Sequence, residues 1–180
     1  MTNPAARAAR RLAVVAGLAT ALCATGTAAS HAATTIDCST GPVSITTSNT
    51  VVQLTGTCST VVVDAGNTTV RLDAASRVTI KGGNNTVTAR KVGSATLRGG
   101  NHALRVSARL STATVRASNS TIRTASASRI TIKGSNNRVR STRLTKVVVR
   151  GANNTVKVTK GSTKVSNRGA NNTIKVKKRR

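Results

Sequence analysis

Residues 77–87 read RVTIKGGNNTV, and closely similar stretches occur at 129–139, RITIKGSNNRV, and at 146–156, KVVVRGANNTV. The first Asn of each stretch belongs to a longer series, which we call the marker asparagines. They recur in steps of 17 or 18 residues: Asn49, Asn67, Asn84, Asn101, Asn119, Asn136, Asn153 and Asn171. Self-similarity at a fixed period is the sequence signature of repeat architectures. The spacing therefore predicts eight units of nearly equal length.

Apolar and polar residues alternate around each marker asparagine. The positions six and four residues before the marker are mostly apolar, as in Val78 and Ile80, and the position between them is mostly Thr, as in Thr79. The position three residues after the marker is apolar in every unit, from Val52 to Ile174. Alternation with a period of two indicates β-strands with one buried face.

A unit this small cannot bury its own apolar face, but parallel stacking of neighbouring units does so. The sequence therefore predicts an all-β fold: a single-stranded parallel β-helix, or β-solenoid, of about eight coils of 17–18 residues. Because parallel crossovers are overwhelmingly right-handed, we expect right-handed coils. Residues at the same position relative to the marker then form columns along the stack. We expect the marker asparagines to be buried in an Asn ladder, in which side-chain amides bond from coil to coil.

The N-terminal residues have the pattern of a secretory signal. Arg7, Arg10 and Arg11 form a positive region, the chain from 12 to 24 is mostly apolar, and residues 30–32 fit a small-residue cleavage site. The sequence therefore predicts a cleaved signal peptide over 1–32, with no transmembrane helix after processing. The remaining chain divides into an N-terminal cap segment over 33–42, the solenoid repeat domain over 43–176 and a basic tail over 177–180.

Two cysteines, Cys38 and Cys58, remain after this cleavage. In an oxidising compartment a disulfide is the default expectation for such a pair. One coil step of 18 residues before Cys58 is Thr40, two residues from Cys38, so the pair lies close enough to bridge. We expect this disulfide to fasten the N-terminal end of the stack.

The composition excludes an ordinary core and points to a charged partner. The chain has no Phe, Tyr or Trp, and its 29 Lys and Arg against 3 acidic residues give a formal net charge of +26. The core must therefore consist of Val, Ile, Leu, Ala and Thr, residues that suit a pleated sheet. The charge predicts attraction to polyanions or anionic surfaces.

Many of the cations fall into two outward-facing columns, one three residues before the marker and the other four residues after it. We call the first the corner row: Lys81, Arg98, Arg116, Lys133, Arg150 and Arg168. We call the second the face row: Arg105, Arg123, Arg140, Lys157 and Lys175. These residues are the candidate polyanion-binding site. Two acids fall one coil step from a cation, which predicts local ion pairs between Asp64 and Lys81 and between Asp73 and Arg90.

Catalysis is not expected. General acid–base chemistry needs titratable groups with divergent pKa values, and the three Asp residues and His102 occupy different columns. His102 stands in the column that follows the marker, among Asn and Ser residues such as Asn85 and Ser120, and we expect it to be a polar turn residue. We expect no cofactor and no metal site.

The sequence predicts a secreted or cell-wall-associated solenoid that binds anionic wall polymer, anionic lipid or acidic polysaccharide. Without aromatic stacking residues, any binding of nucleic acid would be sequence-independent and directed at the phosphate backbone. Two alternatives are a purely structural repeat protein, in which the cations serve solubility, and an ice-binding protein that uses the Thr column beginning at Thr79.

The Asn-Asn-Thr-Val core of the repeat, as in residues 84–87, resembles a known family. It is similar to small exported actinobacterial proteins that carry the domain of unknown function numbered 3060. The resemblance covers residues 43–176 and implies an exported parallel β-helix. It implies no activity, ligand or catalytic residue.

Overall fold

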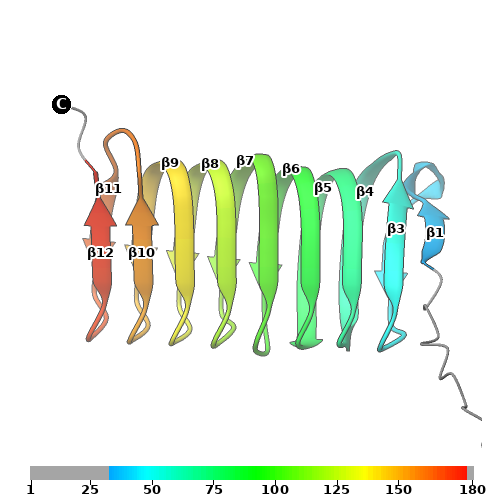
Figure 1. The fold of residues 1–180 in the computed structure, drawn as a ribbon, viewed down its shortest axis with the longest axis horizontal. Helices are drawn as coiled ribbons and strands as arrows, with labels where there is room; N and C mark the ends of the chain where they lie inside the picture. Colours follow the sequence, from blue (N-terminus) through cyan, green and yellow to red (C-terminus); the bar gives the residue numbers. More distant parts are fainter. Residues whose placement is uncertain (1–32, 178–180) are drawn as a thin grey trace, which may run out of the picture. The chain divides into compact units, whose positions relative to one another are not determined.

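The computed structural model describes residues 33–177, and the predicted signal peptide and residues 178–180 lie outside this range. Within it the chain is a β-solenoid with parallel strand pairing throughout, in which successive coils lie side by side (Figure 1). The elements are β1 (Thr34–Asp37), the 3₁₀ helix η1 (Cys38–Thr40), β2 (Val43–Ile45), β3 (Val51–Thr55), β4 (Thr57–Gly66), β5 (Thr69–Gly83), β6 (Thr86–Leu97), β7 (Ala103–Val115), β8 (Thr121–Ile132), β9 (Arg138–Val149), β10 (Thr155–Val158), β11 (Lys164–Asn167) and β12 (Thr173–Val176). The predicted all-β solenoid of about eight coils is confirmed.

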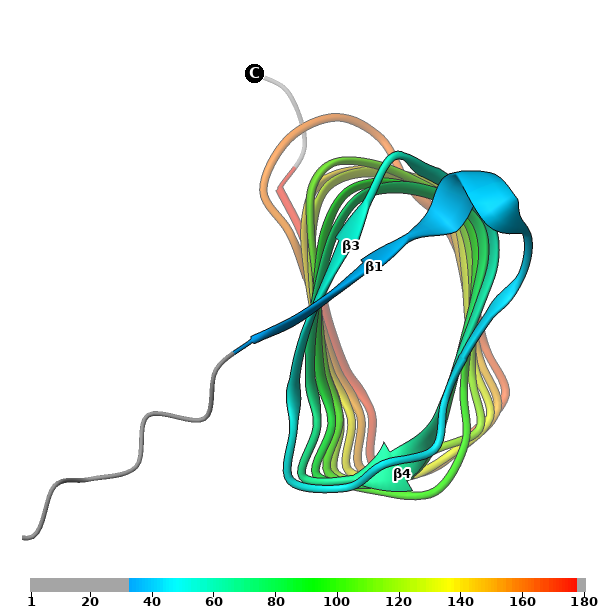
Figure 2. The same ribbon diagram turned by 90° about the vertical axis from the view of Figure 1, so that its right-hand side faces the viewer.

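Each coil has two long sides that meet at corners (Figure 2). One side carries the residues after each marker and the other carries the residues before it. The strand register pairs each residue with one 17 or 18 positions away, as in Val70 with Val87 and Val78 with Ala95. Residues this far apart in sequence therefore lie directly over one another, as the repeat predicts.

The core lies between the two long sides and consists of the predicted apolar columns. Val78, Ile80 and Val87 are fully buried, as are their counterparts in neighbouring coils. The two ends of the stack differ. At the N-terminal end Leu54 is buried, whereas in the last coil Val165 is 46% exposed although it occupies the same column as Val78. The C-terminal end of the described chain is therefore the less covered of the two.

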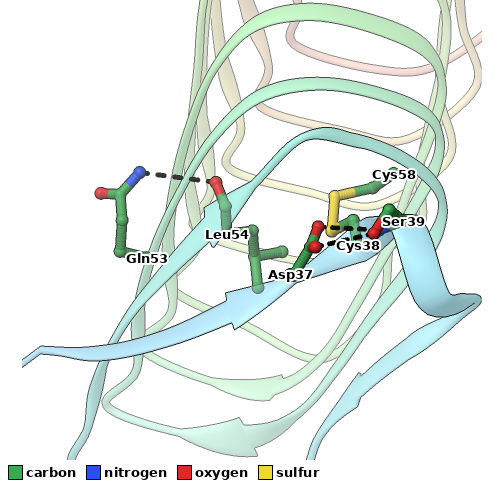
Figure 3. The surroundings of a disulfide bond; sticks show 6 residues. All are labelled: Asp37, Cys38, Ser39, Gln53, Leu54 and Cys58. Atoms are coloured by element: carbon green, nitrogen blue, oxygen red, sulfur yellow. Dashed lines mark hydrogen bonds between the residues drawn. A yellow bond between two sulfur atoms is a disulfide. The ribbon is translucent and has the colours of Figure 1, made fainter.

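The N-terminal end is fastened by the predicted disulfide, which the structure confirms between Cys38 and Cys58, with their Cα atoms 4.8 Å apart (Figure 3). Cys38 begins η1, and the Asp37 carboxylate caps this helix by accepting a hydrogen bond of 2.9 Å from the backbone N–H of Ser39. Before the helix, β1 pairs in register with β3. The predicted N-terminal cap segment over 33–42 thus adds one more strand to the sheet.

The marker asparagines turn the corner between the two long sides. All eight have a left-handed backbone, with φ between 53° and 59°. Asn tolerates this conformation better than most residues do. Their side chains are exposed, so the expectation that they are buried is wrong. Among the described residues, one side-chain bond joins two markers, from the Asn67 amide to Asn49 Oδ1 at 3.0 Å.

A buried ladder does exist, but it occupies the next column. There the backbone N–H of each residue donates to the side chain of the residue one coil further on, as from Ser120 to Asn137 Oδ1 (2.9 Å) and from Asn137 to Asn154 Oδ1 (2.8 Å). The Asn137 side-chain amide also donates to the Ala117 carbonyl at 2.9 Å. These inward-pointing amides satisfy backbone groups that the corner would otherwise bury without partners.

The opposite corner absorbs the difference between steps of 17 and 18 residues. In β7 two residues, Ser107 and Ala108, occupy the place that Arg90 alone fills in β6, so the register shifts at a β-bulge. The last step of 18 is accommodated by the loop over 159–163, the taller loop between β10 and β11 in Figure 1. This corner is therefore where the coils differ most in shape.

Candidate polyanion interface

The face row lies on the side of the solenoid formed by the strand segments that follow each marker. Strand pairing places Arg105 beside Arg123 and Arg123 beside Arg140. Lys157 and Lys175 continue the same line in β10 and β12. Because adjacent strands are about 4.8 Å apart, the face row is a straight line of five exposed cations at that spacing.

The corner row lies on the opposite side, next to the marker corner. From Arg98 onward the backbone N–H of each member donates to a carbonyl of the preceding coil, as from Arg98 to Ile80 (2.9 Å) and from Arg150 to Ile132 (2.8 Å), and Lys81 is held in register with Asp64. These residues are therefore stacked as well. The core separates the corner row from the face row, so the structure divides the predicted binding residues between two faces.

A second basic column lies on the same side as the corner row, with Arg129, Lys146 and Lys164 in register. Between these two basic columns runs the Thr column that suggested ice binding. Its members, such as Thr114 and Thr131, are half-buried. The Thr hydroxyls thus lie between long charged side chains, which is unlike the flat neutral array that this alternative requires.

The predicted ion pairs are confirmed. Lys81 Nζ lies 3.0 Å from Asp64 Oδ2, and Arg90 Nε lies 2.6 Å from Asp73 Oδ1. The hydrogen bond from Arg90 holds the pKa of Asp73 below its usual value. All three acidic residues precede residue 74, whereas among residues 33–73 Arg71 is the single Lys or Arg. The charge is therefore segregated along the stack, and the cations from Arg98 onward face no acid in the described chain.

A shallow groove of about 490 Å³ lies beside the face row. One wall is formed by Arg105, Arg123 and Arg140, and small side chains, including Ser107 and Thr142, form the rest of its lining. The bulge at Ser107 and Ala108 lies at its edge. The columns of the repeat do not predict this groove, because the shape of the groove depends on how the chain folds at the opposite corner.

His102 is buried in the ladder column. Its Nδ1 accepts a hydrogen bond from the Asn85 N–H (3.4 Å), and its Nε2 lies 2.6 Å from the Arg98 carbonyl oxygen. This geometry selects the neutral tautomer with the proton on Nε2. Burial lowers the pKa of His102, which the bond to Arg98 partly offsets. The ring occupies the place of an Asn in the ladder, as expected for a polar turn residue.

Residues 33–177 contain neither a metal-binding cluster nor a membrane-spanning helix. No group of three or more His, Cys, Asp or Glu residues is placed to hold a metal ion. In the same range no helix has the length and apolar character needed to cross a membrane.

The fold and its surface define the class of this protein: an all-β repeat protein with two stacked cationic rows. Residues 45–101 and 115–171 each match the family described as "Protein of unknown function (DUF3060)". The chain belongs to this family. No curated protein and no solved structure matches the chain.

Proposed function

We propose that the protein is an exported, non-catalytic solenoid that associates through its basic rows with anionic cell-envelope or extracellular polymers. The observation that carries this proposal is the face row, in which five cations occupy successive rungs without an acidic neighbour. Stacked like charges repel one another, and a bound polyanion removes this repulsion while releasing its own counterions.

The location follows from two features. The disulfide between Cys38 and Cys58 fits an oxidising compartment, and the predicted signal peptide supplies the route of export. We infer a secreted or wall-associated protein, and its resemblance to exported actinobacterial proteins implies an actinobacterial origin. Wall polymer, anionic lipid and acidic polysaccharide all have the required charge.

A second candidate function is purely structural, with the charge serving solubility. Exposed Lys and Arg on strands discourage edge-to-edge association. Lys175 lies on β12, the last strand, at the less covered C-terminal end of the solenoid. The two candidates differ in one measurable property, because a purely structural solenoid does not need to hold a polymer at physiological salt.

The test is a binding assay with the exported protein, using wall polymer, anionic liposomes and duplex DNA over a salt series. We expect binding at low salt, with the logarithm of the association constant falling linearly with the logarithm of salt concentration. Absence of binding to all three at low salt would favour the structural role. A salt-independent affinity would also contradict the proposal, because it would place the contacts outside the basic rows.

A further inference from the structure

Resting on the function proposed above, we propose that the groove beside the face row is a binding site for the phosphate groups of a linear phosphodiester polymer. Its arginine wall would grip successive phosphates along the solenoid axis. This assigns the ligand chemistry to one face of the molecule and leaves the corner row a general electrostatic role.

The groove owes its shape to a column of small side chains in successive coils. The position two residues beyond the face row carries small side chains in four successive coils, whereas in the two preceding coils it carries Asp73 and Arg90. The small residues are Ser107, Ala125, Thr142 and Thr159. The β-bulge at Ser107 adds a residue to β7 at this point. Bulges re-aim side chains and are common beside functional sites. The hollow therefore runs along the coils that carry Arg105, Arg123 and Arg140, and Thr88 and Thr159 in the coils on either side complete its lining.

Some side-chain hydroxyls of the groove are already bonded to backbone carbonyls, and others are not. Thr124 donates its hydroxyl to the Ser126 carbonyl at 2.9 Å, and Ser141 donates to the Arg143 carbonyl at 2.7 Å. By contrast, the exposed hydroxyls of Ser107, Thr142 and Thr159 form no hydrogen bond within the described chain. These three are available to donate to an anion beside the arginine wall.

The arginines themselves are equally available. Within residues 33–177 both ion pairs lie in earlier coils, so no acid competes for Arg105, Arg123 or Arg140. A guanidinium presents a planar fork of donors that matches two oxygens of a phosphate, whereas an ammonium acts as a point charge. The groove wall is all Arg, and Lys appears in the face row only beyond it.

The shape favours a thin chain over other sources of phosphate. A volume of about 490 Å³ suits a ligand of small-molecule width, and the cations continue past the groove to Lys157 and Lys175. A flexible polymer can enter the hollow and follow this line. A duplex is too wide to enter, and a bilayer would meet the rim of the groove rather than its floor.

The experiment compares two variants with the same loss of charge. The groove variant replaces its three arginines: Arg105→Gln, Arg123→Gln and Arg140→Gln. The matched control replaces three arginines of the corner row: Arg98→Gln, Arg116→Gln and Arg150→Gln. All six positions are exposed, so both variants should fold, and thermal unfolding checks this. The probe is poly(glycerol phosphate) at fixed ionic strength.

We expect the groove variant to lose at least about tenfold more affinity than the control, because it loses directed charge-assisted hydrogen bonds as well as charge. A smaller difference would overturn the groove assignment and leave the proposed function standing, since both rows would then act by charge alone. If the wild-type protein does not bind the probe or any other polyanion at low salt, the proposed function fails as well.

Two further arms test the ligand chemistry. Poly-glutamate of matched charge number should bind the wild-type protein more weakly than poly(glycerol phosphate), and equal or tighter binding would overturn the choice of phosphate. Vesicles containing phosphatidylglycerol supply the same phosphodiester from a lipid. If the groove substitutions abolish vesicle binding but spare the polymer, the site belongs to a lipid headgroup and the polymer assignment is wrong.

Discussion

The backbone N–H of Asn137 donates to the side-chain Oδ1 of Asn154, one coil further along the stack, at 2.8 Å. Neither residue is a marker asparagine, yet both are buried. Bonds of this kind run from Thr68 to Asn172 through the ladder column. They tie each coil to the next on the inside of the corner, where water cannot satisfy the backbone.

Adjacent asparagines should therefore respond differently to substitution. Asn137→Ala should lower the free energy of unfolding by about 3 kcal/mol, because the Ser120 N–H and the Ala117 carbonyl lose their partner in a buried site. Asn136→Gly should change the free energy of unfolding by less than about 0.5 kcal/mol. Asn136 is exposed, and glycine adopts its φ of 57° freely. Urea unfolding measures both, and equal effects would contradict the division of roles.

Tight backbone approach at the marker corner gives a second prediction. A Cβ on Gly134 would lie far inside van der Waals contact of the Ala117 carbonyl, whereas a Cβ on Gly83 would come no closer than 4.0 Å to any neighbour. Gly134→Ala should destabilise the protein by about 3 kcal/mol through this overlap, and Gly83→Ala should be nearly neutral. Thermal unfolding of the two variants measures the difference, and a tolerated Gly134→Ala would mean that the coils are further apart here.

His102 should make stability depend on pH. Its pKa in the folded protein is lowered below the usual 6.5, so the folded state binds fewer protons than the unfolded state. The free energy of unfolding therefore has its full value above pH 6.5. It falls as the pH drops below 6.5, by at most about 1.4 kcal/mol per pH unit. Urea unfolding at about pH 5 and about pH 7.5 brackets this range.

The control for this prediction is His102→Asn, which places in the ladder the amide found in neighbouring coils, such as Asn85. This variant should lose most of the change in unfolding free energy between the two pH values. If the wild-type protein and the variant show the same pH dependence, His102 is not its source.

Removing the disulfide should loosen the N-terminal end. The bridge joins residues 20 apart, and in the chain-entropy description a loop of this length contributes about 3 kcal/mol. Replacing both Cys38 and Cys58 with Ala should lower the unfolding free energy by about this amount. Because the remaining coils keep their contacts, hydrogen exchange should increase mainly in β1–β4. Uniformly faster exchange along the stack would show instead that the end controls the whole solenoid.

The column pattern was sufficient to predict which residues stack, because a solenoid converts sequence period directly into spatial neighbours. The pattern placed Val78 and Ile80 in the core, and it placed the two partners of each ion pair beside one another. The ladder was placed one residue too early. Asn84 and Asn85 are equally polar in sequence, and what separates them is backbone conformation: a residue with φ of 58° points its side chain outward and its successor inward.

A signal for this assignment was present. The marker follows Gly or another small residue at a corner, and Asn is the side chain that most readily takes a left-handed conformation there. The groove had no such signal. Its hollow depends on where the extra residue of an 18-residue step is accommodated, and in β7 this is the bulge at Ser107 and Ala108. Periodicity shows that a step is longer without showing which corner holds the addition.

The central claim is that the stacked cations of the face row act together on one anionic chain. The slope of the logarithm of the association constant against the logarithm of salt concentration, measured with poly(glycerol phosphate), tests it most directly. Five cooperating cations predict a slope of about −3.5 for a single-stranded polyanion. A slope near zero, or no binding at low salt, would contradict it.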